Sequence, residues 1–393
     1  MRKVRIAVVN SHPIQYFAPM YAYLNASDDL EVSALYCTDF SLRGGNDPGF
    51  KRPVKWDIDL TAGYKSVFLG ERAKLRVPGG FFSLIVPEIW REVRSGEYDV
   101  LVLHGHGYAA YLIALVAAKT NGIPVMMRGE THLGLQRSPM KRFLRRLLIG
   151  ALYRFCDRFL AIGTANHQFY RAMGVPEKKI FLVPYSVDND RFIHASQLRD
   201  EERVAVRRSL GAALDRPVVL YASKFMPRKH PDDVIRAATV LKKRGLDFTL
   251  IMVGTGEMED QLRSLVAELG PDKVIFPGFI NQSELPRIYA ASDVFVLPSE
   301  NEAWGLVVNE AMCAAMPVVV ADEVGCVPDL VRDGENGYHH QVGDVAGLAV
   351  ALERILGDPD LRKRMGQASL NRISYWGYAQ CLEGFRAAVR ELP

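Results

Sequence analysis

Short apolar runs alternate with longer amphipathic stretches along the whole chain. In the first half the clearest apolar runs cover residues 4–10, 98–105, 123–129, 158–164 and 180–185. Between them lie stretches whose apolar positions have helical spacing, such as residues 109–122 and 139–156. Continuously apolar strands with helices between them are typical of parallel sheets that are covered on both faces. The first half therefore predicts a doubly wound α/β sheet.

The same rhythm restarts after a polar, charge-rich segment at residues 188–217. The second set of apolar runs covers residues 218–224, 248–254, 273–279, 293–299 and 316–322. A chain of 393 residues fits two domains of roughly 150–200 residues each. We therefore predict Rossmann-like domains over residues 1–190 and 191–377, with a cleft between them. The last helical stretch, residues 378–393, is expected to pack back on the first domain.

Composition and charge narrow the class of protein. Hydrophobic residues make up 49% and charged residues 24%, which is the balance of a globular protein. A net charge of +4 is too small to indicate a nucleic-acid binder. The N-terminal apolar stretch is too short for a signal peptide, and no apolar run is long enough to span a membrane. The five cysteines are scattered along the chain, which favours reduced thiols over disulfides. We expect a cytoplasmic protein.

Ligands of open parallel sheets bind beyond the carboxyl ends of the strands, and cations gather at one such position. The run at 218–224 ends in Lys224, and Arg228 and Lys229 follow just before a helix predicted to begin near Pro231. Cations beside a helix N-terminus suit a diphosphate, because the helix end adds N–H donors. A solvated basic loop is the structural alternative.

Two glutamates stand eight positions apart where the run at 293–299 turns into a helix. Glu302 precedes Gly305, which lets backbone N–H groups approach a ligand, and Glu310 lies one turn into the helix. Carboxylates accept paired hydrogen bonds from vicinal diols, and a sugar nucleotide has one diol on the ribose and one on the sugar. The alternative is that both acids only favour a helix N-terminus.

These segments together resemble a known family. Residues 294–337, with Glu302, Glu310, AMCAAMPVVVAD and DGENG, are similar to the donor-site signature of family 4 of the retaining glycosyltransferases. SKFMPRKHPDDVIRA is similar to the family's phosphate segment, and VGTGEMEDQL and FPGFINQSELPRIYAASDVFVLPS match in order and spacing. The resemblance covers nearly all of residues 180–375. It implies the GT-B fold, with two Rossmann-like domains facing across a nucleotide-sugar cleft.

The resemblance also implies the donor-side residues. Lys224 and Lys229 would contact the diphosphate with Arg228 beside them, Glu302 the transferred sugar, and Glu310 the ribose. The donor-binding loops would be Gly278, Phe279 and Ile280 near the base, and Ala303, Trp304, Gly305 and Leu306 near the phosphate or sugar.

The chain departs from the family pattern at two of these loops. Lys224 stands where arginine is usual and therefore lacks the bidentate fork. The loop at 324–330 has Cys326 and Asp329 where the family has a second glycine and a glutamate, and it therefore carries less weight. Gly254 and Gly256 are interpreted as turn residues.

The acceptor-side candidates end strands of the first half. The family places a cleft-facing histidine at the end of the strand at 98–103, which assigns it to His104, with His106 as the alternative. His12 and Gln15 follow the first strand, in an N-terminal SHPIQYF segment that some family members share, and a capped turn is the structural alternative there. Arg128 and Glu130 end the third strand, where an Arg–Glu structural pair is the alternative. His104, His106 and His132 could form a metal site, but the resemblance implies no metal and no cofactor.

Residues 139–156 predict a basic amphipathic helix, with Lys141, Arg142, Arg145 and Arg146 among apolar positions. Such a helix suits peripheral contact with anionic lipid on the inner face of the membrane. Packing against the core with one solvated face is the favoured interpretation.

The sequence therefore predicts a retaining, metal-independent glycosyltransferase that moves a sugar from a nucleoside diphosphate, with UDP favoured, to a hydroxyl acceptor. Three alternatives stay open: a sugar-nucleotide epimerase, a sugar phosphorylase, and a non-catalytic nucleotide-sugar binding protein.

Overall fold

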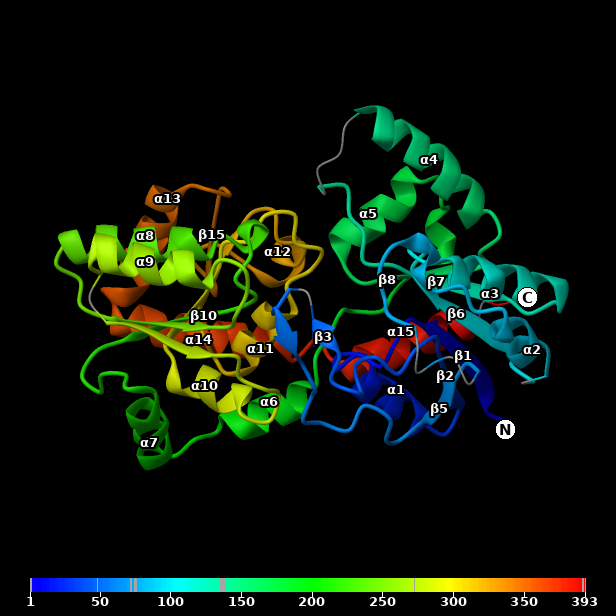
Figure 1. The fold of residues 1–393 in the computed structure, drawn as a ribbon, viewed down its shortest axis with the longest axis horizontal. Coiled ribbons are helices and arrows are strands. Elements are labelled where there is room, and N and C mark those ends of the chain that lie inside the picture. The colour runs from blue at the N-terminus through cyan, green and yellow to red at the C-terminus, as the bar shows by residue number, and fades with distance from the viewer. Residues whose placement is uncertain are drawn as a thin grey trace. The chain divides into compact units, whose positions relative to one another are not determined.

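The chain folds into two compact units, which Figure 1 shows as ribbons. The computed structural model describes residues 2–47, 49–70, 73, 76–95, 97–134, 139–271, 273–390 and 392. Unit 1 comprises Met1–Gly45, Ile58–Asp188 and Gly377–Pro393, and unit 2 comprises Asn46–Asp57 and Asn189–Trp376. The expected boundary near residue 190 lies beside the observed division. The assignment of Asn46–Asp57 to unit 2 has no counterpart in the sequence pattern.

Unit 1 is built on a parallel sheet with the strand order β5-β2-β1-β6-β7-β8-β9. Its strands are β1 (Val4–Asn10), β2 (Leu30–Tyr36), β5 (Lys65–Phe68), β6 (Val100–His104), β7 (Val125–Arg128), β8 (Arg158–Ala161) and β9 (Ile180–Leu182). The strand order reverses between β1 and β6. In open parallel sheets, ligands bind beyond the carboxyl ends of the strands at such a reversal.

Unit 2 repeats this arrangement with the order β12-β11-β10-β13-β14-β15, again with parallel neighbours. Its strands are β10 (Val218–Ala222), β11 (Thr249–Val253), β12 (Val274–Gly278), β13 (Val294–Leu297), β14 (Val318–Ala321) and β15 (Gly337–His340). A separate antiparallel pair joins β3 (Asn46–Asp47) and β4 (Arg52–Pro53). Here the order reverses between β10 and β13, which end beside the predicted cations and acids.

Helices cover both faces of each sheet. Those of unit 1 are α1 (Ala18–Asn25), α2 (Glu88–Ser95), α3 (Ala109–Thr120), α4 (Pro139–Tyr153), α5 (Thr164–Ala172) and α15 (Tyr378–Arg390). Those of unit 2 are α6 (Asn189–Ser196), α7 (Asp200–Leu210), α8 (Pro231–Lys243), α9 (Glu259–Leu269), α10 (Leu285–Ala291), α11 (Leu306–Cys313), α12 (Val327–Leu330), α13 (Val345–Leu356) and α14 (Pro359–Ile373). In Figure 1, α8, α9 and α13 lie on one side of the unit 2 sheet and α6 and α10 on the other, while α14 contacts both α11 and α13.

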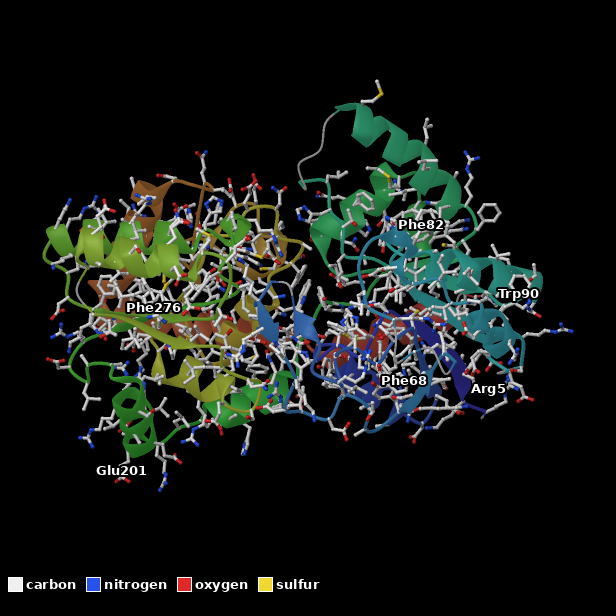
Figure 2. The ribbon with its side chains drawn as sticks, in the orientation of Figure 1. Arg5, Phe68, Phe82, Trp90, Glu201 and Phe276 are labelled. Carbon is white, nitrogen blue, oxygen red and sulfur yellow. The ribbon has the colours of Figure 1, made fainter. Side chains whose placement is uncertain are left out.

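Burial on both faces explains why the central strands are apolar at nearly every position. In β1, Ala7 and Val9 join the core under α2 and α3, while Ile6 and Val8 are equally buried on the opposite face. Side chains fill the space between sheet and helices in both units (Figure 2). The predicted fold class, two Rossmann-like α/β sheets, is confirmed.

Three strands of the two parallel sheets have no counterpart among the predicted runs, namely β2, β5 and β15, and the same holds for β3 and β4 of the separate pair. The sequence of β2 is interrupted by Glu31 and Ser33, and β5 and β15 are four-residue strands at sheet edges. Short edge strands bury one side only, so their sequences lack the continuous apolar pattern of central strands.

Helix α4 covers most of the predicted basic helix at 139–156. The side chains of residues 141–145 lie outside the described residues, and these include Lys141, Arg142 and Arg145. Among the described side chains, Met140, Leu147 and Leu148 are exposed. Within the described part of the chain, helices fall short of the length and apolar character needed to cross a membrane. Peripheral membrane contact stays a prediction.

The C-terminal helix α15 packs on β8, β9 and α1 of unit 1, as Figure 1 shows in red beside α1. Gly384 makes this close approach possible, because a Cβ there would lie 2.0 Å from the carbonyl oxygen of Leu182. Backbone cannot yield as a flexible side chain does, so a larger residue must displace the helix.

Gly384→Ala should therefore lower the melting temperature, although alanine is the better helix former by about 1 kcal/mol. The matched control is Ala387→Gly on the exposed side of α15, which should cost only that propensity difference. Thermal unfolding followed by circular dichroism measures both variants. A Gly384→Ala protein as stable as the wild type would contradict the close contact.

Candidate functional site

The predicted donor-side residues gather where the strands of unit 2 end. Lys224 follows β10, and a single turn of 3-10 helix, Pro227–Lys229, leads into α8. Glu302 follows β13 and precedes α11. Since β10 and β13 are neighbours on either side of the strand-order reversal, their loops meet at one edge of the sheet.

Glu302 joins the two loops by ion pairs. Its Oε2 atom accepts a short hydrogen bond from Lys229 Nζ and lies 3.4 Å from Arg228 Nη1. The side chains of Lys229 and Glu302 are only 10% and 14% exposed, so this contact is largely screened from water. The backbone adds a further link, because Glu300 N donates to Arg228 O at 2.8 Å.

Burial lowers the pKa of Lys229 below its ordinary 10.5, because desolvation penalises the charged ammonium. The Glu302 carboxylate opposes that shift, while the nearby charges of Arg228 and Lys224 add to it. Repulsion among these cations favours a ligand that brings further negative charge.

The loop at 324–326 holds the Glu302 loop in place through its backbone. Gly325 N donates to Glu302 O and Cys326 N donates to Trp304 O, each at 3.0 Å. A Cβ on Gly325 would lie 2.1 Å from the carbonyl oxygen of Ala303. The side chains of this loop differ from the family pattern, which lowered its weight as a predicted donor loop, whereas its contribution comes from the backbone.

Gly305 caps the N-terminus of α11 with φ +93°, a conformation that favours glycine. The first N–H groups of α11 have no partner within the helix, which is the property that makes a helix N-terminus an anion site. Leu306 is the first residue of α11 and Ala303 lies in the preceding loop.

The glycines after β11 also prove to be close-approach residues rather than simple turns. A Cβ on Gly254 would lie 2.0 Å from Ser223 O, and one on Gly256 would lie 2.3 Å from Phe225 O. In addition, Phe225 N donates to Thr255 O at 2.9 Å. These glycines let the loop after β11 pack against the backbone on both sides of Lys224. This role depends on a contact between two loops, so the sequence around the glycines does not show it.

Glu310 lies deeper than the other predicted site residues. It is fully buried in α11, and its Oε2 accepts a hydrogen bond of 2.8 Å from the Tyr289 hydroxyl. Trp304 is also buried, with its indole N–H bonded to Asn309 Oδ1 and its ring stacked on Trp376 at 5.6 Å. Because the Glu310 carboxylate is buried, a diol can reach it only after the side chains that cover it move.

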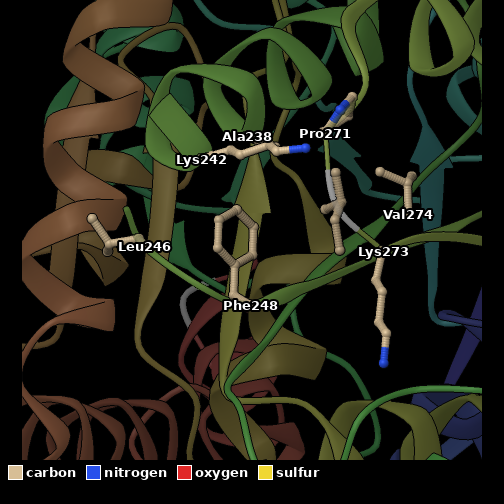
Figure 3. A pocket seen from close by; sticks show the side chains of 8 residues that line it. Ala238, Lys242, Leu246, Phe248, Pro271, Lys273 and Val274 are labelled. Carbon is tan, nitrogen blue, oxygen red and sulfur yellow. The ribbon is translucent and has the colours of Figure 1, made fainter. Parts of the chain in front are cut away.

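The predicted base-contacting loop leaves β12 at the same sheet edge. Gly278 has φ +81° and its carbonyl accepts from Gly254 N at 3.0 Å, while Phe279 and Ile280 follow. A small pocket lined by Phe248 and Lys273 lies at the opposite, amino-terminal edge of β11 and β12 (Figure 3). It is therefore separate from the candidate site.

In unit 1, His104 is the last residue of β6, and its ring lies among aromatic side chains. Its Nε2 lies 2.8 Å from the Tyr21 hydroxyl, which also accepts from Asn10 Nδ2, and its ring centre lies 4.3 Å from that of Phe17. Desolvation, with a smaller contribution from the Arg128 charge, lowers the pKa of His104 well below its ordinary 6.5. The imidazole is consequently neutral at pH 7.

Arg128 is the last residue of β7 and Glu130 follows two positions later, and each has a hydrogen-bond partner of its own. The Arg128 guanidinium is buried and donates to the carbonyls of Val183 and Pro184 at 2.7 and 3.3 Å. Glu130 is exposed and accepts from the Tyr185 hydroxyl at 2.8 Å. Arg128 thus stabilises the backbone after β9, and acceptor contacts of either residue stay predictions.

The remaining candidates of unit 1 lie near the surface after β1 and β6. His12 is half-buried, with Nδ1 3.0 Å from Ser11 Oγ, and Gln15 is half-buried nearby. The ring of His106 meets Tyr153 edge-on at 6.1 Å. Within the described ranges, no group of three or more histidine, cysteine or acidic side chains could hold a metal ion.

Two family models and several relatives match the chain over most of its length. The model of the family described as Glycosyl transferases group 1 matches residues 202–372, and that of Glycosyltransferase Family 4 matches residues 47–191. A D-inositol 3-phosphate glycosyltransferase of Streptomyces scabiei is 30% identical over 331 residues, 78% of this chain and 72% of the relative. The putative glycosyltransferase EpsD of Bacillus subtilis is 26% identical over 89% of this chain and 94% of its own length. The resemblance stated from the sequence is confirmed.

Solved structures of the same fold cover the whole chain at low identity. Anabaena HepE in complex with UDP matches with a TM-score of 0.75 and 17% identity over all of both chains. Sucrose-phosphate synthase from Thermosynechococcus elongatus matches with a TM-score of 0.75 and 20% identity over 99% of both chains. At these identities the similarity shows the fold alone.

The Lys229–Glu302 contact predicts how the lysine titrates. Glu302→Gln removes the negative charge that opposes desolvation, so the pKa of Lys229 should fall further below 10.5. A pH titration of ¹³Cε-labelled lysines by NMR measures the shift, and Lys229→Arg assigns the resonance by removing it. An unchanged or raised pKa in Glu302→Gln would contradict the pairing.

Proposed function

The chain belongs to the glycosyl transferases of group 1, and from that premise we propose that it is a retaining, metal-independent transferase. The proposed donor is a nucleoside diphosphate sugar with UDP as the favoured nucleotide, and the proposed acceptor is a hydroxyl group of a glycan, glycolipid or small metabolite. The observation that carries this proposal is the cluster of Lys229, Arg228 and Glu302 at the carboxyl edge of unit 2.

Electrostatics support the role of the cluster. As the bond between the sugar C1 and the β-phosphate oxygen breaks, negative charge grows on the departing diphosphate. Lys224 and Lys229 would stabilise that charge more strongly in the transition state than in the bound donor, which is the condition for catalysis. The ammonium groups would thereby supply the charge stabilisation that a metal ion provides elsewhere.

The donor's hydroxyl groups need acceptors of hydrogen bonds, which the two glutamates provide. Glu302 would bind hydroxyls of the transferred sugar from its position beside Lys229. Glu310 would bind the ribose diol after the side chains around it move, because its carboxylate is buried. Backbone N–H groups at Gly305 and Leu306 would bind a phosphate or sugar oxygen at the start of α11.

The reaction needs no nucleophile from the protein. The acceptor oxygen would form the new bond to C1 on the face from which the diphosphate leaves, and the acceptor proton would pass to a β-phosphate oxygen. This same-face route preserves the configuration at C1. His104, neutral at pH 7, would be a hydrogen-bond partner for uncharged sugar hydroxyls rather than a second cation.

The HepE structures give a specific reason to favour UDP. HepE was solved with UDP, with UDP and glucose, and with UDP-glucose. A thermal-shift panel of nucleoside diphosphates and their sugars should therefore show the largest stabilisation with UDP compounds, because a ligand that binds only the folded protein raises its melting temperature.

The donor selected by that panel should then be incubated with sugar and lipid acceptors. Proton NMR of the product should show the anomeric configuration of the donor, and EDTA should leave the rate unchanged. Epimerised donor without transfer, a requirement for inorganic phosphate, or binding without turnover would each overturn the proposal in favour of one of the three alternatives.

Lys229→Ala should reduce kcat by roughly 10²-fold, because it removes a group that stabilises transition-state charge. The matched control is Lys273→Ala, which removes an exposed lysine of unit 2 at the opposite sheet edge. Steady-state kinetics should show near wild-type activity for the control, and melting curves should show that both variants fold. A kcat of Lys229→Ala close to that of the control would remove the lysine from the mechanism.

A further inference from the structure

A short segment of the N-terminal half belongs structurally to unit 2. The chain leaves unit 1 after Gly45, contributes Asn46–Asp57 to unit 2, and returns to unit 1 at Ile58. This segment, called here the inserted hairpin, contains the antiparallel strands β3 and β4. The sequence pattern gave no indication of it.

The inserted hairpin contacts the loops that follow three adjacent strands of the unit 2 sheet, β10, β11 and β12. After β10, the ammonium of Lys224 lies 4.5 Å from the ring centre of Phe50. After β11, Thr255 Oγ1 donates to Phe50 O at 3.1 Å. After β12, the ring of Phe279 lies 5.0 Å from that of Phe50 and 6.0 Å from that of Trp56. The hairpin therefore covers the carboxyl edge where the donor is proposed to bind.

Hydrogen bonds fix the far end of the hairpin to the same unit. Asn281 Nδ2 donates to Lys55 O at 2.8 Å, and Ser283 N donates to Asp57 Oδ1 at 3.1 Å. The Ser283 hydroxyl also donates to Asp57 Oδ2. Polar contacts at Lys55 and Asp57 and aromatic contacts at Phe50 and Trp56 together hold the hairpin against unit 2.

The contact with Lys224 is the most informative, because it places an aromatic face against a predicted donor-binding group. The Lys224 ammonium lies 4.5 Å from the ring centre of Phe50, which is the geometry of a cation–π interaction. An ammonium has three N–H donors, so one side can face a ring while the others reach phosphate oxygens.

Gly49 packs against the side chain of Lys224. A Cβ at this position would lie 2.6 Å from Lys224 Cδ and 2.9 Å from its Nζ, so the lysine stem lies directly on the Gly49 backbone. Lysine has a flexible four-carbon stem and must lose rotamer freedom to hold one position. Gly49 and Phe50 together restrict that freedom before any ligand arrives.

We propose that the inserted hairpin is a positioning element of the donor site, in which Gly49 and Phe50 hold Lys224 in the orientation that binds the diphosphate. The proposal rests on the proposed function, since it assigns a role to Lys224 in donor binding. It also accounts for a departure from the family pattern: the hairpin supplies the rigidity that a lysine lacks where the family has arginine.

Isothermal titration with UDP tests the proposal in the full-length protein. Phe50→Leu keeps the apolar contact but removes the π face, and should weaken UDP binding by roughly fivefold to tenfold. Phe50→Tyr and Phe50→Trp should restore affinity to within about twofold, because both keep an aromatic face toward the ammonium. Lys55→Ala, which removes a charge from the same hairpin but keeps the backbone carbonyl bonded to Asn281, should bind UDP as the wild type does.

A double-mutant cycle separates positioning from a merely structural effect. If Phe50 acts through Lys224, then Phe50→Leu should have no further effect in a Lys224→Met background. Gly49→Ala should behave in the same way. Its new methyl group meets a flexible side chain, so Lys224 should move while the melting temperature stays near that of the wild type.

The outcomes distinguish the two proposals. Absence of binding by the wild type to UDP or any other nucleoside diphosphate would overturn the proposed function itself. If Lys224→Met weakens UDP binding while Phe50→Leu and Gly49→Ala bind as the wild type does, only the positioning role is wrong. Tighter binding by Phe50→Leu would show instead that the hairpin blocks the site, and additive losses in the double mutant would show that it acts without Lys224.

Discussion

The contact between Lys229 and Glu302 is the interaction on which the candidate site depends. Two loops from neighbouring strands bring several cations to one sheet edge, where repulsion alone would drive them apart. The carboxylate of Glu302, largely shielded from water, pairs with both Lys229 and Arg228 and so keeps the loops together. Burial nevertheless lowers the pKa of Lys229, which means that the acid does not fully compensate the loss of hydration. The site is therefore assembled without a ligand and still favours an anion.

Close backbone packing between loops fixes the positions of these charged side chains. Gly254 and Gly256 let the loop after β11 lie against the backbone around Lys224, and Gly325 lets the next loop bond to Glu302. At each place a side chain would meet a carbonyl oxygen at little more than 2 Å. Loops are ordinarily the mobile parts of an α/β fold, but loops locked to one another by backbone contacts can hold charged groups in fixed positions.

The two units present chemically different surfaces at equivalent edges of similar sheets. Unit 2 presents ammonium, guanidinium and carboxylate groups. Unit 1 presents His104 within an aromatic group that includes Phe17 and Tyr21, where desolvation keeps the imidazole neutral. This difference follows from the side chains at the strand ends and not from the fold, since both sheets share the same strand order around their reversal points. It fits an anionic donor on one unit and an uncharged hydroxyl acceptor on the other.

The sequence by itself determined the central strands and the fold class, because strands buried on both faces must be apolar at nearly every position. It also identified the strand-end residues of unit 2, since strand ends and helix starts can be located from local patterns and the family resemblance fixes their spacing. The tertiary structure alone decided three things: that Glu302 pairs with Lys229, that Glu310 is fully buried, and that Asn46–Asp57 lies on unit 2 with Phe50 against Lys224. The contacts behind them join residues that lie far apart in the sequence, for example 21 positions for Tyr289 and Glu310 and 174 for Phe50 and Lys224. No local pattern encodes such contacts, because they arise only when the folded sheet brings distant loops to the same edge.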